Sequence, residues 1–100
     1  MKIIAGDRQP TPDATLIRAL RNAHRWTDAM SGGISLRQLA QNVRHTERYI
    51  ARIATLAGLS PTIQTAIMDG LAPIDLTLEV LTRRPIPLDW REQERLFTMD

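Results

Sequence analysis

Residues 36–55, LRQLAQNVRHTERYIARIAT, constrain the fold more than any other part of the chain. At about 3.6 residues per turn, the second half of this segment, continued to residue 57, separates into two faces. The apolar face holds Tyr49, Ile50, Ile53, Ala54, Leu56 and Ala57. The opposite face holds Glu47, Arg48, Ala51, Arg52 and Thr55. The segment therefore predicts two short helices joined by a turn, the second packed inward on one face and exposed on the other.

Helix start and stop signals predict further helices before this turn. Thr11 followed by Pro12 is typical of a helix start, and Ser31-Gly32-Gly33 is typical of a stop. Ser35, with Gln38 three residues later, has the spacing of a capping box at the start of the next helix. The apolar residues expected on one face of the first helix are Leu16, Leu20, Ala23, Thr27 and Met30.

Glycine and proline divide the rest of the chain in the same way. The third helix is expected to run from about Glu47 to Ala57 and to end at Gly58. Three more segments follow: a helix from Ser60-Pro61 to Gly70, a short helix over Leu76 to Thr82, and a helix capped by Asp89 that runs through Trp90, Leu96 and Phe97.

This succession of helices leaves no room for a sheet. The predicted fold is all-α, a compact bundle of five to six short helices containing a helix-turn-helix at residues 35–57. Residues 1–11 lack a sustained period and are expected to form an N-terminal arm. Residues 12–100 are expected to form a single helical domain, because a chain of this length supports one small core.

Positive charge is concentrated where the two-helix segment lies. The whole chain carries a net charge of +2, but residues 18–55 hold seven arginines against Asp28 and Glu47, a net charge of +5. The planar guanidinium group suits phosphates and guanine edges. Arg18, Arg21 and Arg25 form a further stripe on the first helix, for which a solvated surface is the favoured interpretation and a phosphate contact the alternative.

The helix-turn-helix pattern fits the helices better than the turn. Ala40 supplies the small residue expected where the helices cross, and Ile50 and Ile53 supply the paired apolar residues. Arg44 stands where a glycine is usual, so we expect either a left-handed residue at a cost of about 1 kcal/mol or a different turn. His45 stands where an aliphatic residue is usual, so its ring is expected to tuck partly inward or to leave the turn loosely packed.

The exposed face of the second helix of the pair predicts contacts with DNA bases. An arginine there can donate two hydrogen bonds to guanine, a glutamate can accept one from cytosine, and methyl groups can contact thymine. The predicted base contacts are Thr46, Glu47, Arg48, Ala51, Arg52 and Thr55. The predicted backbone contacts are Ser35, Arg37, Gln38, Gln41, Arg44 and His45.

Some side chains on and near these surfaces also have a purely structural interpretation. Glu47 in the first turn of a helix would complement the helix dipole. Arg52 would form an ion pair with a neighbouring domain or subunit. Tyr49, beside them, is expected to pack in the core with its hydroxyl at the surface. His24 is expected to be a packed or hydrogen-bonded histidine rather than a general base.

Several motifs together resemble the C-terminal helix-turn-helix region of bacterial and phage-derived serine recombinases of the resolvase/invertase type, which is related in form to ParB-type DNA-binding domains. The motifs are Ala23-His24-Arg25-Trp26, Glu47-Arg48-Tyr49-Ile50-Ala51-Arg52, Ser60-Pro61-Thr62-Ile63, Ala66-Ile67-Met68-Asp69-Gly70, Asp75-Leu76-Thr77 and Pro87-Leu88-Asp89-Trp90-Arg91-Glu92-Gln93. The resemblance implies an all-α DNA-binding domain that follows a catalytic domain in full-length relatives. Arg48 and Arg52 match its motif, whereas Arg44-His45 departs from it.

No enzymatic activity, cofactor or metal is expected. The only serines, Ser31, Ser35 and Ser60, stand at helix ends where capping explains them, and the absence of cysteine fits a reducing cytoplasm. The expected partner is double-stranded DNA, bound by a homodimer formed through the C-terminal helices or by a domain tethered to a catalytic one, with no membrane involved. The alternative is a helical protein–protein interaction module that docks a partner on the first helix and on residues 90–97.

Overall fold

The structure, a computed structural model, describes residues 9–98, and every regular element among them is helical. The all-α prediction is confirmed for this part of the chain. Most of the predicted arm, residues 1–8, lies outside the described residues. The elements are α1 (Ala14–Ser31), α2 (Leu36–Val43), α3 (Glu47–Ala54), the 3₁₀ helix η1 (Thr55–Gly58), α4 (Pro61–Met68), α5 (Leu78–Thr82) and α6 (Trp90–Thr98).

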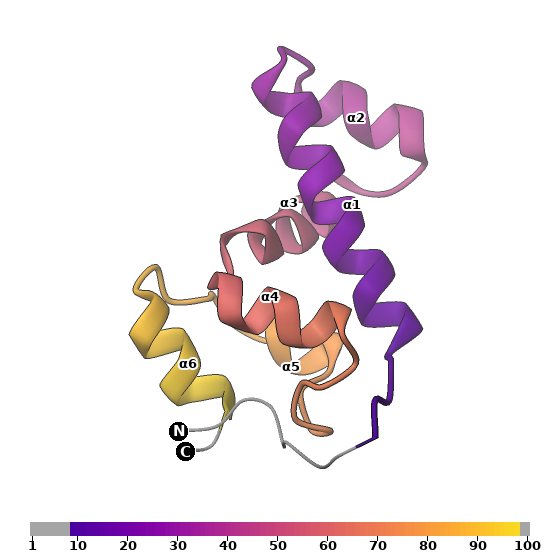
Figure 1. Ribbon diagram of the computed structural model, residues 1–100. Coiled ribbons are helices and arrows are strands. Elements are labelled where there is room, and N and C mark those ends of the chain that lie inside the picture. The colour runs from indigo at the N-terminus through magenta and orange to yellow at the C-terminus, as the bar shows by residue number, and fades with distance from the viewer. Residues whose placement is uncertain (1–8, 99–100) are drawn as a thin grey trace.

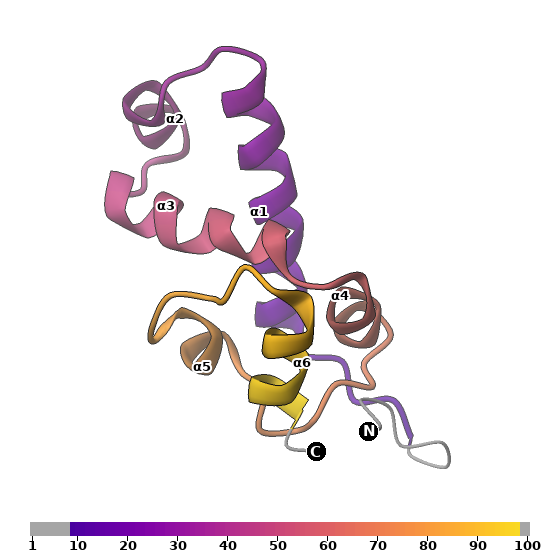
Figure 2. The same ribbon diagram turned by 90° about the vertical axis from the view of Figure 1, so that its left-hand side faces the viewer.

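The long helix α1 supports the other helices along its length. The molecule measures 44 × 25 × 22 Å. Helix α2 lies at one end beside the C-terminal half of α1, α3 crosses the middle of α1, and α4, α5 and α6 gather at the other end (Figures 1 and 2). The turn between α2 and α3 therefore lies between the α2 end and the middle of the molecule, on the side of α3 away from α6 (Figures 1 and 2).

One hydrophobic core runs from α1 to α6. Its residues are Leu16, Ala19, Leu20, Ala23, Trp26, Leu39, Ala40, Ile50, Ile53, Leu56, Leu59, Ile63, Ala66, Ile67, Leu76, Leu81 and Phe97. Helix α2 contributes two buried residues to this core, Leu39 and Ala40, while its Leu36 and Val43 pack against the core partly buried. The buried face of α1 includes Trp26, which is 3% exposed, whereas Thr27 and Met30 are only partly buried.

The capping signals place most helix ends correctly. The Ser35 hydroxyl accepts a hydrogen bond from the Gln38 amide, and the Gln38 side chain accepts one from the Ser35 amide, which completes the predicted capping box. Ser60 caps α4 with Pro61 at its first position, and Gly70, with φ 72°, follows its end. An added Cβ on Gly70 would lie 2.9 Å from the Pro12 nitrogen, so this glycine also permits a close approach of the chain.

Three predicted helix limits are wrong by a few residues. Helix α1 is capped by the Asp13 carboxylate, which accepts from the Leu16 amide at 3.1 Å, rather than by Thr11, whose amide donates to the Gly70 carbonyl at 2.8 Å. Helix α3 ends at Ala54 and continues as η1, which turns Leu56 into the core. Helix α5 begins at Leu78, because the Thr77 hydroxyl caps the Val80 amide.

Helix α6 is held by a polar side chain that the sequence did not single out. Phe97 is buried, but Trp90 is 53% and Leu96 48% exposed. Gln93 is 1% exposed: its Nε2 donates to the carbonyls of Gly58 at 3.0 Å and Pro87 at 2.7 Å, and its Oε1 accepts from the Ser60 amide at 2.7 Å. One amide thus joins α6 to the start of α4 and to the loop before α6.

Candidate nucleic-acid interface

The turn between α2 and α3 contains the left-handed residue that was one of the two predicted possibilities. Arg44 has φ 60° and ψ 41°, and it is the only non-glycine residue with positive φ among residues 9–98. The His45 amide then donates to the Ala40 carbonyl at 3.2 Å and closes the turn. The chain therefore keeps the left-handed turn conformation that usually selects glycine, at the cost of placing an arginine in it.

The aromatic residues at this turn correct two predictions. The His45 ring does not tuck inward: it is exposed and stacks on the Tyr49 ring, with centroids 4.5 Å apart and planes 28° apart. Tyr49 is 39% exposed rather than a core residue: its ring packs beside the buried Trp26, with centroids 6.3 Å apart, and its other neighbour is the exposed His45. The stack covers the outer side of Trp26, whose ring centroid lies 6.0 Å from that of His45.

The two-faced character of α3 is confirmed. Ile50 and Ile53 are 0% and 2% exposed and belong to the core. The residues of the opposite face, Glu47, Arg48, Ala51, Arg52 and Thr55, are all exposed. Thr55 lies beyond the end of α3, in η1, and its hydroxyl donates to the Arg52 carbonyl at 2.7 Å, which leaves its methyl group as the surface feature.

Some of the predicted contact residues already have a role within the fold. The Thr46 hydroxyl caps α3 by accepting from the Tyr49 amide at 3.0 Å. Ser35 and Gln38 form the capping box of α2. The hydroxyl protons and the Gln38 Nε2 group take no part in these caps, so capping and a phosphate contact are compatible. Arg37, Gln41 and Arg44 lie exposed on α2 and the turn.

The positive charge of this surface is not neutralised within the described chain. Among residues 9–98, the only ion pair is the one between Arg95 and Glu92 on α6. None of Arg37, Arg44, Arg48 and Arg52 has such a partner there. Exposed guanidinium groups without a carboxylate partner keep their hydrogen-bond donors available for an anionic ligand.

The structure also brings together residues that no pattern in the sequence connects. Arg83 and Arg84, in the loop after α5, line a groove of about 350 Å³ whose other side is formed by Ala51, Arg52 and Thr55. Both arginines are exposed. They lie outside residues 18–55, in the part of the chain with net negative charge, so the charge distribution along the sequence could not reveal them.

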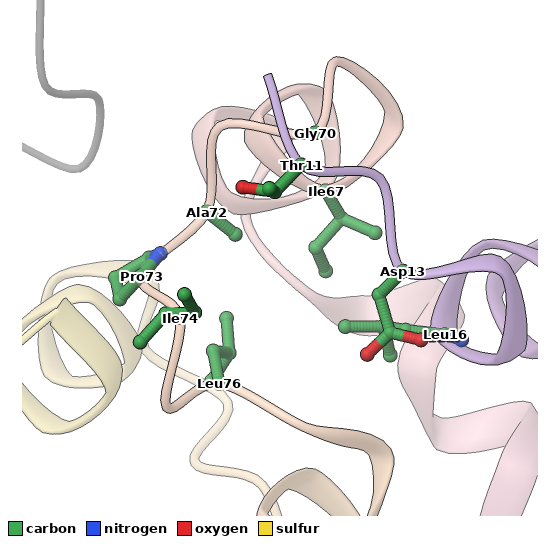
Figure 3. A pocket seen from close by; sticks show the side chains of 9 residues that line it. All are labelled: Thr11, Asp13, Leu16, Ile67, Gly70, Ala72, Pro73, Ile74 and Leu76. Atoms are coloured by element: carbon green, nitrogen blue, oxygen red, sulfur yellow. Dashed lines mark hydrogen bonds between the residues drawn. The ribbon is translucent and has the colours of Figure 1, made fainter. Parts of the chain in front are cut away.

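The pocket at the far end of the molecule offers no comparable chemistry. It encloses about 120 Å³ between the start of α1 and the loop after α4. Figure 3 shows the side chains of Leu16, Ile67 and Leu76 around it, with Asp13 at its side. The Asp13 carboxylate is already used to cap α1. This pocket is mainly a gap between packed apolar side chains.

Two other features of the described residues bear on chemistry. The His24 ring is hydrogen-bonded, as predicted, with Nε2 2.6 Å from Gln64 Oε1, while Gln64 Nε2 donates to the Leu59 carbonyl. Between residues 9 and 98, no three histidine, aspartate or glutamate side chains gather as metal ligands would. No helix in the same range is both long and apolar enough to cross a bilayer.

Comparison of the chain with protein-family models, with curated proteins and with solved structures finds no match. The functional interpretation therefore depends on the surface of α2, α3 and their turn.

Replacing Arg44 with glycine is expected to stabilise the protein by about 0.5 to 1 kcal/mol, because glycine adopts the left-handed conformation without the steric cost that arginine carries. Chemical denaturation followed by circular dichroism measures the change. Gln41→Gly, at an exposed helical position of α2, is the matched control and should destabilise by about 1 kcal/mol. A loss of stability in Arg44→Gly would contradict the left-handed turn.

Proposed function

We propose that this chain is a DNA-binding domain that reads duplex DNA with the exposed face of α3. The observation that carries the proposal is the pair Arg48 and Arg52, one helical turn apart on a face opposite Ile50 and Ile53. Such a helix, packed on one side and exposed on the other, has the dimensions to enter the major groove. Arg48 and Arg52 contact bases, assisted by Thr46, Glu47, Ala51 and Thr55.

Phosphate contacts are assigned to α2 and the turn. Arg37, Gln41 and Arg44 present exposed polar groups there, together with Ser35, Gln38 and His45. These contacts fix the position of the protein on the duplex without reading its sequence. The strained Arg44 fits this role, because a cost in backbone energy at a turn is often retained where the side chain serves a function.

The domain acts as part of a larger assembly in this proposal. A single module with few phosphate contacts binds duplex DNA with a Kd of only about 10⁻⁴ to 10⁻⁶ M at physiological salt. A second copy, or a tether to another DNA-bound domain, raises the effective affinity without new contacts. The proposed setting is the cytoplasm, as the non-catalytic tail of a site-specific recombinase or as a small phage- or plasmid-type regulator.

Removing both reading arginines tests the proposal. Duplexes are first selected from a random pool, and binding of the selected duplex is measured by fluorescence anisotropy over a range of salt concentrations. The double variant Arg48→Ala with Arg52→Ala is expected to bind the selected duplex about tenfold more weakly or worse, since each bidentate arginine–guanine contact discriminates by about 1–3 kcal/mol. Its binding to an unrelated duplex should weaken much less.

Arg18→Ala with Arg21→Ala is the matched control, because it removes the same charge from exposed positions of α1 whose surrounding pocket contains no residue of α3. This control should change the affinity by less than the α3 variant does for the selected duplex. Binding that is independent of salt, or equal losses in both double variants, would rule out reading by α3.

Exposed apolar residues favour the second candidate function, a protein-interaction module. Leu88 is 97% and Trp90 53% exposed where the loop meets α6. Large exposed apolar side chains that lie close together are typical of protein contact surfaces. A partner bound there, with no salt-dependent affinity for DNA, would favour this function over DNA binding.

A further inference from the structure

We propose that Arg83 and Arg84 form a second contact site for the DNA backbone, beside α3 and separate from the α2 side of the interface. The inference rests on the proposed function and extends it to a part of the fold outside the two helices and their turn. The ligand is a phosphodiester group of the same duplex that α3 enters.

The position of the loop is the first support. Arg83 and Arg84 face the exposed side of α3 across a groove of about 350 Å³, with Arg52 and Thr55 on the opposite wall. Arg52 is therefore shared between the reading face and the groove. A duplex seated on α3 has its phosphates on both sides of the major groove, and this loop lies at one border of the reading face.

The charge of the loop is the second support. Arg83 and Arg84 are exposed, and neither has an ion-pair partner among residues 9–98. Together with Arg52 they place three guanidinium groups around one groove. Adjacent unpaired cations repel one another, and an anion between them relieves the repulsion.

The loop is also held in place, which favours a preformed site. Pro85 follows the arginine pair and restricts the backbone at that point. Just before the loop, the Thr82 hydroxyl donates to the Leu78 carbonyl at 2.7 Å within the last turn of α5. On its far side, Arg83 and Arg84 border a pocket lined by Leu96 and Phe97 of α6. The restriction by Pro85 reduces the number of backbone conformations of this loop, which lowers the entropic cost of binding.

The test uses a double variant of the full chain in which both Arg83 and Arg84 are replaced by alanine. Its binding to the selected duplex, and to an unrelated duplex of equal length, is compared with that of the wild-type protein by fluorescence anisotropy. Loss of two phosphate contacts is expected to reduce the slope of log affinity against log salt by about two, and to weaken binding of both duplexes roughly tenfold. Circular dichroism checks that the double variant keeps the helix content of the wild-type protein. Arg83→Lys with Arg84→Lys should keep most of the slope, because a phosphate contact needs the charge and not the arginine fork.

The control Arg18→Ala with Arg21→Ala removes the same charge from α1 and should leave the slope nearly unchanged. If the wild-type protein binds with a salt dependence but the Arg83/Arg84 variant behaves like this control, the loop site is refuted and the proposed function of α3 stands. A preferential loss for the selected duplex would also refute it, because it would show base reading by the loop. If the wild-type protein shows no salt-dependent binding, the proposed function fails and the loop site with it.

Discussion

Replacing Gln93 with alanine is expected to lower the free energy of unfolding by about 3 kcal/mol or more, because an unsatisfied buried polar group costs about 1–3 kcal/mol. The alanine would leave the Gly58 and Pro87 carbonyls and the Ser60 amide without their present partner. A protein of this size has only about 5–15 kcal/mol of stability in total. Urea unfolding followed by circular dichroism at two or more protein concentrations measures the loss.

Two further variants show whether hydrogen bonding causes the effect. Gln93→Glu retains an acceptor for the Ser60 amide, but when ionised it cannot donate to the two carbonyls and places a charge in a buried position, so it should also destabilise strongly. Gln41→Ala, at an exposed position of α2, should change stability by no more than about 0.5 kcal/mol. A loss below about 1 kcal/mol in Gln93→Ala would mean that α6 is not held by this amide.

Replacing Trp26 with alanine is expected to destabilise the protein by about 3–5 kcal/mol, the usual cost of removing a buried aromatic side chain and leaving a cavity. Trp26 is 3% exposed and lies beneath the stacked rings of His45 and Tyr49. Its removal takes away the surface on which the start of α3 and the turn before it pack. Urea unfolding measures the loss of stability.

The second tryptophan of the chain supplies the control. Trp90 is 53% exposed at the start of α6, so Trp90→Ala should cost less than about 1 kcal/mol. Similar losses in the two variants would contradict the burial that distinguishes the two tryptophans. Trp26→Phe, which keeps an aromatic ring at the same place, should fall between these two variants.

Local patterns were sufficient for the helices and for most of their caps. Ile50 and Ile53 lie on one face of α3 and Arg48 and Arg52 on the other because helical periodicity alone determines which side chains share a face. Ser35 and Gln38 form their capping box because both partners lie within four residues. The exposed part of the candidate site could be predicted for the same reason.

Contacts between distant parts of the chain were beyond such patterns. The sequence pattern does not distinguish Gln93 from other polar residues of a helix. It is buried because α6 packs against the start of α4. Arg83 and Arg84 join the candidate site because the loop after α5 returns to α3. Tyr49 was placed in the core because periodicity gives a direction but not a depth of burial.

The small contribution of α2 to the core has a consequence for the energy landscape of the folded state. Helix α2 buries only Leu39 and Ala40 fully, with Leu36 and Val43 partly buried against the core, whereas α1 buries five residues, so we expect partial opening at the α2 end to require less free energy than global unfolding. We therefore expect local stability to decrease along the long axis of the molecule toward α2. A ligand that contacts α2 and α3 together would reduce this difference in local stability, because it binds only the conformation in which both helices are docked.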